Sequence, residues 1–210
     1  MRTHSAGQGL TTEEIRDQLL MLLIGGHETT ATTLAWTLHG LAQNPAALSR
    51  LRDEVTAPAV RQGGVEALRT LPYLGAVIDE SMRLFPIAPF VSRKLLRPMS
   101  VAGVELPVGS YVNPCIYLVQ RRADRWAEPA RFLPERMLDR APAAAQFFPF
   151  GSGPWRCIGA AFALYELRVV LGRLLQRFVP SAVPGVVIHP QLRWLTIAPS
   201  GGLPLRLHAV

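Results

Sequence analysis

The chain has 210 residues, of which 49% are hydrophobic and 18% charged, and its formal net charge is +7. This length and balance predict one domain, or one large part of a domain, and exclude a disordered protein. They also exclude a membrane span of roughly 18 apolar residues, because the richest apolar run, LLMLLI at 19–24, is far too short.

The first residues and the cysteine content favour a cytoplasmic protein. The start, MRTHSAGQGLTTEE, lacks the apolar core of a signal peptide, and two cysteines do not make a disulfide framework. All 22 basic residues except Lys94 are arginine, and they are scattered along the chain. Without a basic run that alternates with aromatic residues, we expect no nucleic-acid partner; an acidic protein partner suits this charge better.

The chain begins with a stretch, 1–9, that we expect to be frayed. A long helix is predicted over 11–43, where Thr11 and Glu14 have the spacing of a capping box. Asn44 and Pro45 end the helical pattern. Such a length is unusual for a helix of a globular protein.

Two shorter helices follow. The first is amphipathic and covers about 46–57, and a loop rich in Pro and Gly is predicted at 58–64. The second covers 72–85, with Pro72 in its first turn and Pro86 just beyond its end.

The second half of the chain is more irregular. We expect strands and a hairpin at 87–116, a long irregular stretch at 120–150, and a glycine-rich loop at 150–159. A helix at 158–178 and short strands at 183–208 complete the chain. The predicted fold class is therefore α+β: mainly α, with small β-sheets.

One of the two cysteines, Cys157, lies on the glycine-rich loop FPFGSGPWRCIG, directly before a predicted helix. The N-terminus of a helix favours a thiolate, which ligates metals and attacks electrophiles. Gly153 and Gly159 allow the backbone to approach a large flat group. An isolated cysteine is more often a buried structural residue, as we expect for Cys115, but the dense spacing from Phe150 to Gly159 argues against that interpretation for Cys157.

A second unusual pattern, GGHETTATT, lies in the middle of the long predicted helix. Gly25 and Gly26 cost the helix roughly 1 kcal/mol each relative to alanine, so close packing or a bound group must favour them. Close packing against another helix is the simpler alternative.

These two patterns together resemble the cytochrome P-450 family, the haem-thiolate monooxygenases. The loop resembles the family's haem-binding loop, which implies that Cys157 is the metal ligand, the axial thiolate on the iron of haem b. The resemblance also implies that Phe150 packs near the sulfur. The residues that it implies for cofactor binding are Gly25, Gly26, Arg93, Phe150, Gly151, Gly153, Trp155, Arg156, Cys157 and Gly159.

The helix pattern resembles the family's distal helix. The glycines would leave room for O2 and porphyrin, and Glu28 and Thr29 would be the catalytic residues that relay protons. His27 occupies a position that is variable in the family, so we do not expect it to be a second metal ligand.

A third motif, Glu80-Ser-Met-Arg83, is a weak signal by itself, because most such pairs are ordinary surface ion pairs. The family has the same Glu-x-x-Arg motif, completed by an arginine of a Pro-Glu-Arg segment, here Arg136. The resemblance implies a buried structural cluster that locks the 120–150 stretch over the cysteine loop.

Other positions follow from the same resemblance. Arg93 falls where the family often places an arginine on a haem propionate; the alternative is a solvated arginine at a strand end. A small apolar organic substrate would face Ile87, Ala88, Phe90, Val91 and residues 197–203.

The sequence departs from the family in two ways. Trp155 stands where the family usually has Arg or His, and Arg156 is its neighbour. The chain has about half the usual length and all its motifs belong to the C-terminal half, so we expect residues 1–210 to correspond to that half, with the N-terminal half absent.

The family resemblance implies a monooxygenase that inserts one oxygen atom of O2 into its substrate. Electrons would come from NAD(P)H through a ferredoxin- or flavodoxin-type donor, because the chain lacks a Gly-x-Gly-x-x-Gly fingerprint. Two alternatives remain. One is a truncated haem-binding fragment without turnover. The other is thiol chemistry at Cys157 without haem, disfavoured because no partner cysteine at C-x-x-C spacing and no evident base are found.

Overall fold

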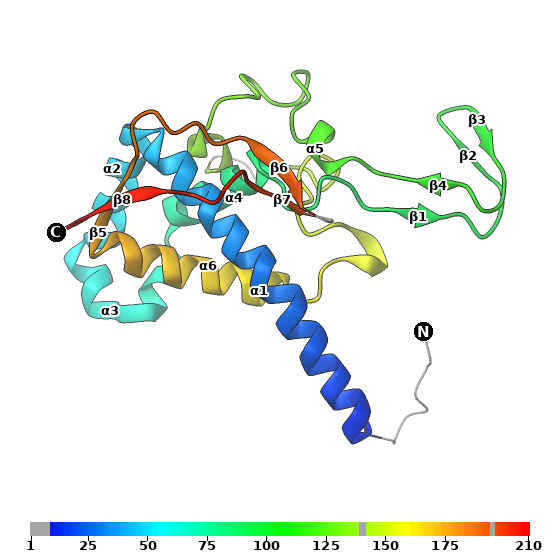
Figure 1. Cartoon of the computed structure of the whole chain (residues 1–210), viewed down its shortest axis with the longest axis horizontal. Helices are drawn as coiled ribbons and strands as arrows, with labels where there is room; N and C mark the ends of the chain where they lie inside the picture. Colours follow the sequence, from blue (N-terminus) through cyan, green and yellow to red (C-terminus); the bar gives the residue numbers. More distant parts are fainter. Residues whose placement is uncertain (1–8, 139–141, 194–195) are drawn as a thin grey trace.

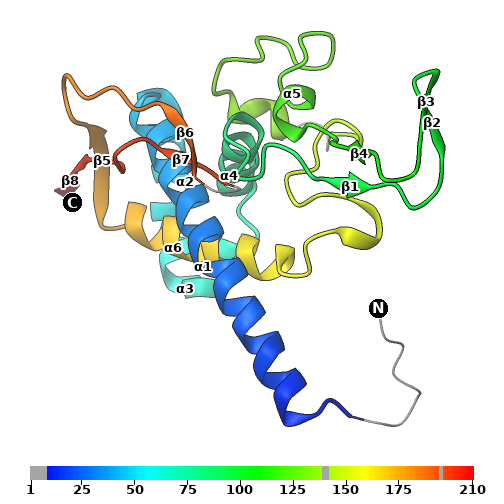
Figure 2. The same cartoon turned by 45° about the vertical axis from the view of Figure 1, so that its right-hand side comes forward.

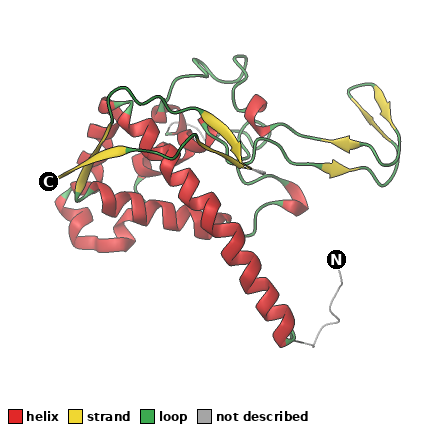
Figure 3. Ribbon diagram, viewed as in Figure 1, coloured by secondary structure: helices red, strands yellow, loops and turns green. Residues whose placement is uncertain are grey.

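The computed structural model describes residues 9–138, 142–193 and 196–210, so most of the expected frayed start lies outside the described residues. The described part is mainly helical with four two-stranded antiparallel sheets, which confirms the predicted fold class (Figures 1 and 3). The helices are α1 (Thr12–Ala42), α2 (Pro45–Thr56), α3 (Pro58–Arg69), α4 (Pro72–Leu84), α5 (Ile116–Val119) and α6 (Ala160–Leu175), with 3-10 turns η1 (Pro134–Met137) and η2 (Gly153–Trp155). The strands are β1 (Arg93–Lys94), β2 (Met99–Val101), β3 (Val104–Leu106), β4 (Tyr111–Val112), β5 (Phe178–Ala182), β6 (Pro190–Arg193), β7 (Thr196–Pro199) and β8 (Leu205–Ala209).

Helix α1 is packed against other elements in one half and projects from them in the other. The Thr11 hydroxyl accepts the Glu14 N–H at 3.2 Å, and the Glu14 carboxylate accepts the Thr11 N–H at 2.9 Å, so the helix starts with the expected capping box. Its second half packs against α4, α6, β5 and β7, whereas its first half projects away from these elements (Figure 2). The projecting half is apolar yet exposed, with its large side chains at Ile15, Leu19, Leu20, Met21, Leu22, Leu23 and Ile24.

The core lies where α1, α2, α3, α4 and α6 meet. Leu41, Leu51, Leu74 and Leu171 are fully buried there. Helices α3 and α6 approach closely at Gly172, where an added Cβ would lie 2.7 Å from a methyl carbon of Leu68. This packing fixes α6, and with it the loop that leads into α6 from Cys157.

The loop predicted at 58–64 is wrong, because α3 already begins at Pro58. A proline in the first turn costs a helix no hydrogen bond, so this residue starts the helix instead of breaking it. Gly64 has φ +64° and kinks the helix in its middle. The composition thus marked a real irregularity, but within a helix.

The strands expected at 87–116 are shorter than predicted. β1 pairs with β4 and β2 with β3, and together they form a long hairpin arm (Figure 1). Cys115 is not in a strand: it directly precedes α5 and is half-buried, with its Sγ 3.5 Å from the Pro89 carbonyl oxygen.

The helix predicted at 158–178 ends earlier, at Leu175, and Phe178 instead begins β5. The strands expected at 183–208 therefore start at 178. β5 pairs with β8 in the register Phe178↔Ala209, so a strand from the end of the chain determines this boundary. Such long-range pairing leaves no local signal in the sequence.

Candidate functional site

The loop that holds Cys157 is shaped by glycines in the left-handed region. Gly151 has φ +70° and Gly153 has φ +66°, where any side chain would be strained. The Cys157 N–H donates to the Phe150 carbonyl oxygen at 2.9 Å and closes the loop. The Cys157 side chain is exposed, and α6 begins three residues later, after Gly159.

The residues around Cys157 form an open apolar surface. Trp155 is 72% exposed and Ile158 is 92% exposed, and Phe162 in the first turn of α6 is exposed as well. Sequence reasoning did not single out Ile158 or Phe162, although large apolar residues beside a functional cysteine could have drawn attention to them. Exposed apolar surface of this kind typically marks a binding site.

Arg93 comes to this surface from β1. Its guanidinium carbon lies 5.8 Å from the centre of the Trp155 ring, a cation–π contact between two elements far apart in sequence. Arg156 is exposed beside it. Two cations and an indole N–H are thus available close to the cysteine loop.

Phe150 contacts both the helical core and the backbone of Cys157. Its side chain is half-buried and packs against the helical core, while its carbonyl oxygen accepts the Cys157 N–H. Phe150 therefore connects the cysteine loop to the core.

The distal glycines are open on one side. No described atom outside the helix lies within 4 Å of a Cβ built on Gly25 or Gly26, so close helix packing within the described chain does not explain them. The Thr29 hydroxyl donates to the Gly25 carbonyl oxygen at 2.7 Å. His27 is exposed, and the described residues include no group of three or more His, Cys, Asp or Glu side chains that could hold a metal ion.

Glu28 is hydrogen-bonded to strand β7, near the C-terminus. The Thr196 hydroxyl on β7 donates to a Glu28 carboxylate oxygen at 3.1 Å, across 168 residues of sequence. Sequence reasoning missed Thr196, because no local pattern relates it to α1. The structure therefore gives Glu28 and Thr29 different partners, although they are neighbours on the helix.

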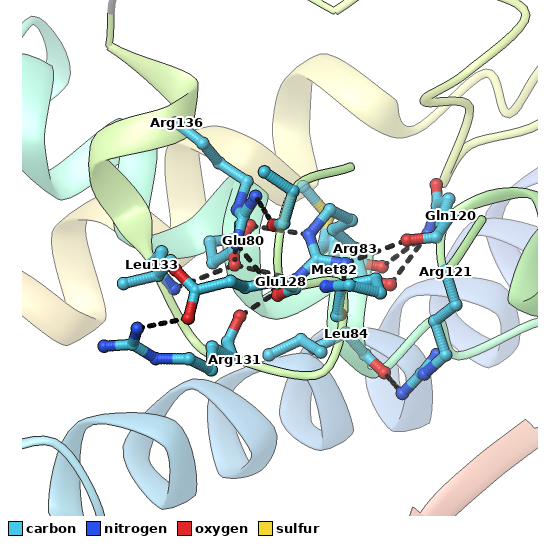
Figure 4. Close-up of polar contacts among 12 residues, drawn as sticks. Glu80, Met82, Arg83, Leu84, Gln120, Arg121, Glu128, Arg131, Leu133 and Arg136 are labelled. Atoms are coloured by element: carbon cyan, nitrogen blue, oxygen red, sulfur yellow. Dashed lines mark hydrogen bonds and ion pairs between the residues drawn. The ribbon is translucent and has the colours of Figure 1, made fainter. Parts of the chain in front are cut away.

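The three residues of the expected structural cluster lie together (Figure 4). Two guanidinium nitrogens of Arg83 donate to the two carboxylate oxygens of Glu80 at 2.7 and 2.8 Å, and both side chains are fully buried. Arg136 from η1 donates to Glu80 at 3.1 Å, and the Leu133 N–H donates to it at 2.9 Å. This bidentate geometry is the strong form of an ion pair.

Arg83 also ties down the irregular stretch. It donates to the carbonyl oxygens of Gln120, Pro129 and Arg131 at 2.9, 2.9 and 3.1 Å. Its guanidinium carbon lies 5.2 Å from the centre of the Trp126 ring. The buried charge of Arg83 is thus fully compensated, and the 120–138 segment is wrapped around it.

Asp79, next to this cluster on α4, is a half-buried acid that sequence reasoning did not single out. Burial raises the pKa of its carboxyl to about 6, although the nearby positive charge of Arg168 acts to lower it. The carboxyl favours its neutral form more than an exposed aspartate does.

The two segments expected to face a substrate, 87–91 and 197–203, are joined by a hydrogen bond of Ile197. Its N–H donates to the Ile87 carbonyl oxygen at 2.8 Å, and its own carbonyl oxygen accepts the indole N–H of Trp36 on α1 at 2.9 Å. The residues at 87–91 are half-buried except Phe90, which is exposed. Chain segments 87–91 and 196–199 are therefore held against α1.

The site fits a haem in its donor chemistry. Cys157 offers an accessible sulfur, and Arg93 and Arg156 offer cations for two carboxylates. The space over Gly25 and Gly26 is open, because a Cβ built at either position meets no described atom outside the helix within 4 Å. Helix α1 packs against α6, so the distal helix and the cysteine loop belong to one packed unit (Figure 2).

Comparisons with known proteins agree with these observations. The sequence profile described as cytochrome P-450 matches residues 1–205. A Mycobacterium tuberculosis protein named cytochrome P-450 135B1 is 37% identical over 203 residues, which are 97% of this chain and 42% of that protein. Another M. tuberculosis protein, named cytochrome P-450 137, is 37% identical over 201 residues, 96% of this chain and 40% of that protein.

A plant protein is also similar. The 11-oxo-beta-amyrin 30-oxidase of Glycyrrhiza uralensis is 33% identical over 211 residues, 98% of this chain and 40% of that protein. The chain thus spans about two-fifths of the length of the curated relatives that it matches. No helix in the described ranges is long and apolar enough to cross a membrane. With its glycine-rich cysteine loop, its buried Glu-x-x-Arg cluster and a profile match over nearly its whole length, the chain belongs to the cytochrome P-450 family.

Proposed function

We propose that this chain is the haem-binding part of a haem-thiolate monooxygenase in which Cys157 supplies the iron ligand. The observation that carries the proposal is the exposed Cys157 thiol on a loop of left-handed glycines, in a chain of the cytochrome P-450 family. Haem b, when bound, supplies the chemistry by which O2 is activated and one oxygen atom is inserted into a C–H bond.

The residues near Cys157 hold the cofactor in this proposal. Arg93 and Arg156 pair with its carboxylates, a task that suits the planar guanidinium group. Trp155 adds one N–H and an apolar face, in place of the charged residue usual in the family. Gly151 and Gly153 keep the loop backbone free of side chains where the flat ring would lie.

Residues of α1 handle protons. The Thr29 hydroxyl, now bonded to the Gly25 carbonyl oxygen, can hold a proton beside the open space over the glycines. The neighbouring residue Glu28 provides a carboxylate, which accepts a hydrogen bond from the Thr196 hydroxyl. An acid and a hydroxyl at adjacent positions can order water for proton transfer at a dry site.

The substrate in this proposal is a small apolar organic molecule. Its lining residues come from 87–91 and from the 197–203 turn, which Ile197 joins to α1. The electron donor is an acidic ferredoxin- or flavodoxin-type protein, to which the net charge of +7 is complementary.

The experiment that tests this proposal is reconstitution with haem, followed by reduction and exposure to carbon monoxide. We expect the strongly red-shifted Soret band of thiolate ligation, its loss in Cys157→Ala, and its retention in the matched control Cys115→Ala. An unshifted band in the unchanged chain, or a red-shifted band that survives Cys157→Ala, would contradict the assignment.

A second candidate function is haem binding without turnover by these residues alone. The observation that favours it is the first half of α1, whose large apolar side chains are exposed, in a chain that spans 42% of a relative. Product formation from a reconstituted, ferredoxin-supplied chain separates the candidates. A thiolate spectrum with no substrate-induced spectral change and no product supports the second.

A further inference from the structure

Gln120 directly follows α5 and has a fully buried side chain (Figure 4). Its Nε2 donates to the carbonyl oxygens of Met82 and Arg83 at 3.0 and 3.2 Å, and its Oε1 accepts the Phe148 N–H at 3.3 Å. Two carbonyl oxygens require the nitrogen and one N–H requires the oxygen, so all three partners agree on one orientation of the amide.

From Phe148 the hydrogen bonds continue to the cysteine. The Phe148 carbonyl oxygen accepts the Gly151 N–H at 2.9 Å, and the Phe150 carbonyl oxygen accepts the Cys157 N–H at 2.9 Å. On the other side, Arg83 donates to the Gln120 carbonyl oxygen at 2.9 Å. Gln120 therefore lies between the buried ion cluster and the loop that presents Cys157.

The hydrogen bond from Phe148 to Gln120 differs from the other hydrogen bonds of the cysteine loop. Among the described residues, the other hydrogen bonds of the segment 142–159 stay within the segment or lead into α6. Gln120 supplies the hydrogen bond that ties this segment to a different part of the chain. Other anchors of this segment are the packed helix α6, which begins at Ala160, the half-buried rings of Phe147 and Phe150 against the core, and the Arg93 contact to Trp155. Ring packing is tolerant of small shifts, whereas a three-way hydrogen-bonded amide is not.

We propose that Gln120 is a positioning residue for the Cys157 loop. It holds the loop in place because it bonds both to Arg83 of the Glu80–Arg83–Arg136 cluster and to the backbone of Phe148. The inference rests on the proposed function only for its effect on haem. The effect of Gln120 on the position of the Cys157 loop does not depend on haem.

The test compares Gln120→Met with a matched control, Gln176→Met. Gln176 is also buried and also donates through Nε2 to a backbone carbonyl oxygen, that of Val55, at 2.8 Å, but at the opposite end of α6 from Cys157. Both changes remove a buried amide of the same size. Only Gln120→Met removes a hydrogen bond of the 142–159 segment.

The first measurement is hydrogen exchange of the haem-free chain. In Gln120→Met we expect exchange in the 147–157 segment to become about tenfold faster or more, because the Phe148 N–H loses its acceptor. Gln176→Met leaves the same segment unchanged. Equal exchange of this segment in both variants overturns the proposal.

A second variant separates loop position from overall stability. Gln120→Glu keeps an oxygen that can accept the Phe148 N–H but loses both donors, so we expect a lower unfolding temperature with the 147–157 segment still protected. Exchange as fast as in Gln120→Met would overturn the proposal.

The last measurement is the carbon monoxide spectrum of the haem-loaded chain. We expect Gln120→Met to lower the fraction of haem in the thiolate form, and Gln176→Met to leave it unchanged; a thiolate fraction unchanged in Gln120→Met overturns the proposal. If the unchanged chain takes up no haem, the proposed function fails, while hydrogen exchange still decides the role of Gln120.

Discussion

Two Glu-x-x-Arg ion pairs, one in α3 and one in α4, have opposite surroundings. In α3, Glu66 and Arg69 form an ion pair at 2.6 Å with side chains 72% and 53% exposed. In α4, Glu80 and Arg83 have the same spacing, but both are fully buried and share a third partner, Arg136. The comparison teaches that an i, i+3 ion pair acquires structural importance through what surrounds it, because water weakens the first pair and a ring of carbonyl oxygens completes the second.

The largest expected effect removes one member of the buried pair. Arg83→Met leaves the Glu80 carboxylate buried without its main partner, and we expect about 3–5 kcal/mol less stability. Arg69→Met, its counterpart in α3, should change stability by about 0–1 kcal/mol. Urea unfolding of both variants checks this, and similar losses in the two would break the comparison.

The same contrast between buried and exposed positions applies within α1. Leu41 is fully buried in its second half, and Leu23 is 66% exposed in its first half. We expect Leu41→Ala to cost about 2–5 kcal/mol and Leu23→Ala less than about 0.5 kcal/mol. A large loss of stability from Leu23→Ala in the same unfolding measurement would mean that a partner covers the first half of α1.

A smaller effect sharpens the picture of α4. The pKa of Asp79 in the fold, about 6, lies above its ordinary value of 3.8, so the folded state binds this proton more tightly than the unfolded state. The resulting stabilisation is fully present below pH 3.8 and is lost as the pH rises through about 6. Asp79→Asn should therefore raise stability at pH 7 by about 1–3 kcal/mol and flatten the pH dependence between these values. Thermal unfolding at several pH values measures this, and an unaltered pH dependence would refute it.

The smallest expected effect concerns the exposed end of α1. Thr11→Ala removes the hydroxyl that accepts the Glu14 N–H, a cap typically worth about 1 kcal/mol. Because this end does not pack against the core, we expect faster hydrogen exchange in the first turn and an unchanged unfolding temperature. A clear fall in unfolding temperature would show that the end of α1 is coupled to the core.

Several features of the fold could be predicted because they depend on neighbours in the chain. The capping box at Thr11 and Glu14 starts α1 at the expected place, and Pro72 starts α4. The left-handed glycines at 151 and 153 agree with the expected close approach of the loop backbone. Such signals are local, so they can be identified in a single sequence.

Features that depend on distant residues could not be predicted in this way. Pro58 starts a helix where composition indicated a loop, and β5 replaces the last turn of a predicted helix because β8 pairs with it. The Thr196 contact to Glu28 joins residues 168 apart. No spacing in the sequence indicates these contacts.

The sequence by itself therefore determined the residue types available for chemistry: a cysteine on a glycine-rich loop, an acid and a hydroxyl after two helical glycines, and a glutamate with two arginines. Only the tertiary structure decided that Glu80 and Arg83 are buried while Glu66 and Arg69, at the same spacing, are exposed, and that Gln120 connects the buried pair to the cysteine loop. The physical reason is that residue spacing specifies geometry within a helix or turn, whereas burial and hydrogen-bond partners arise when segments tens of residues apart pack together.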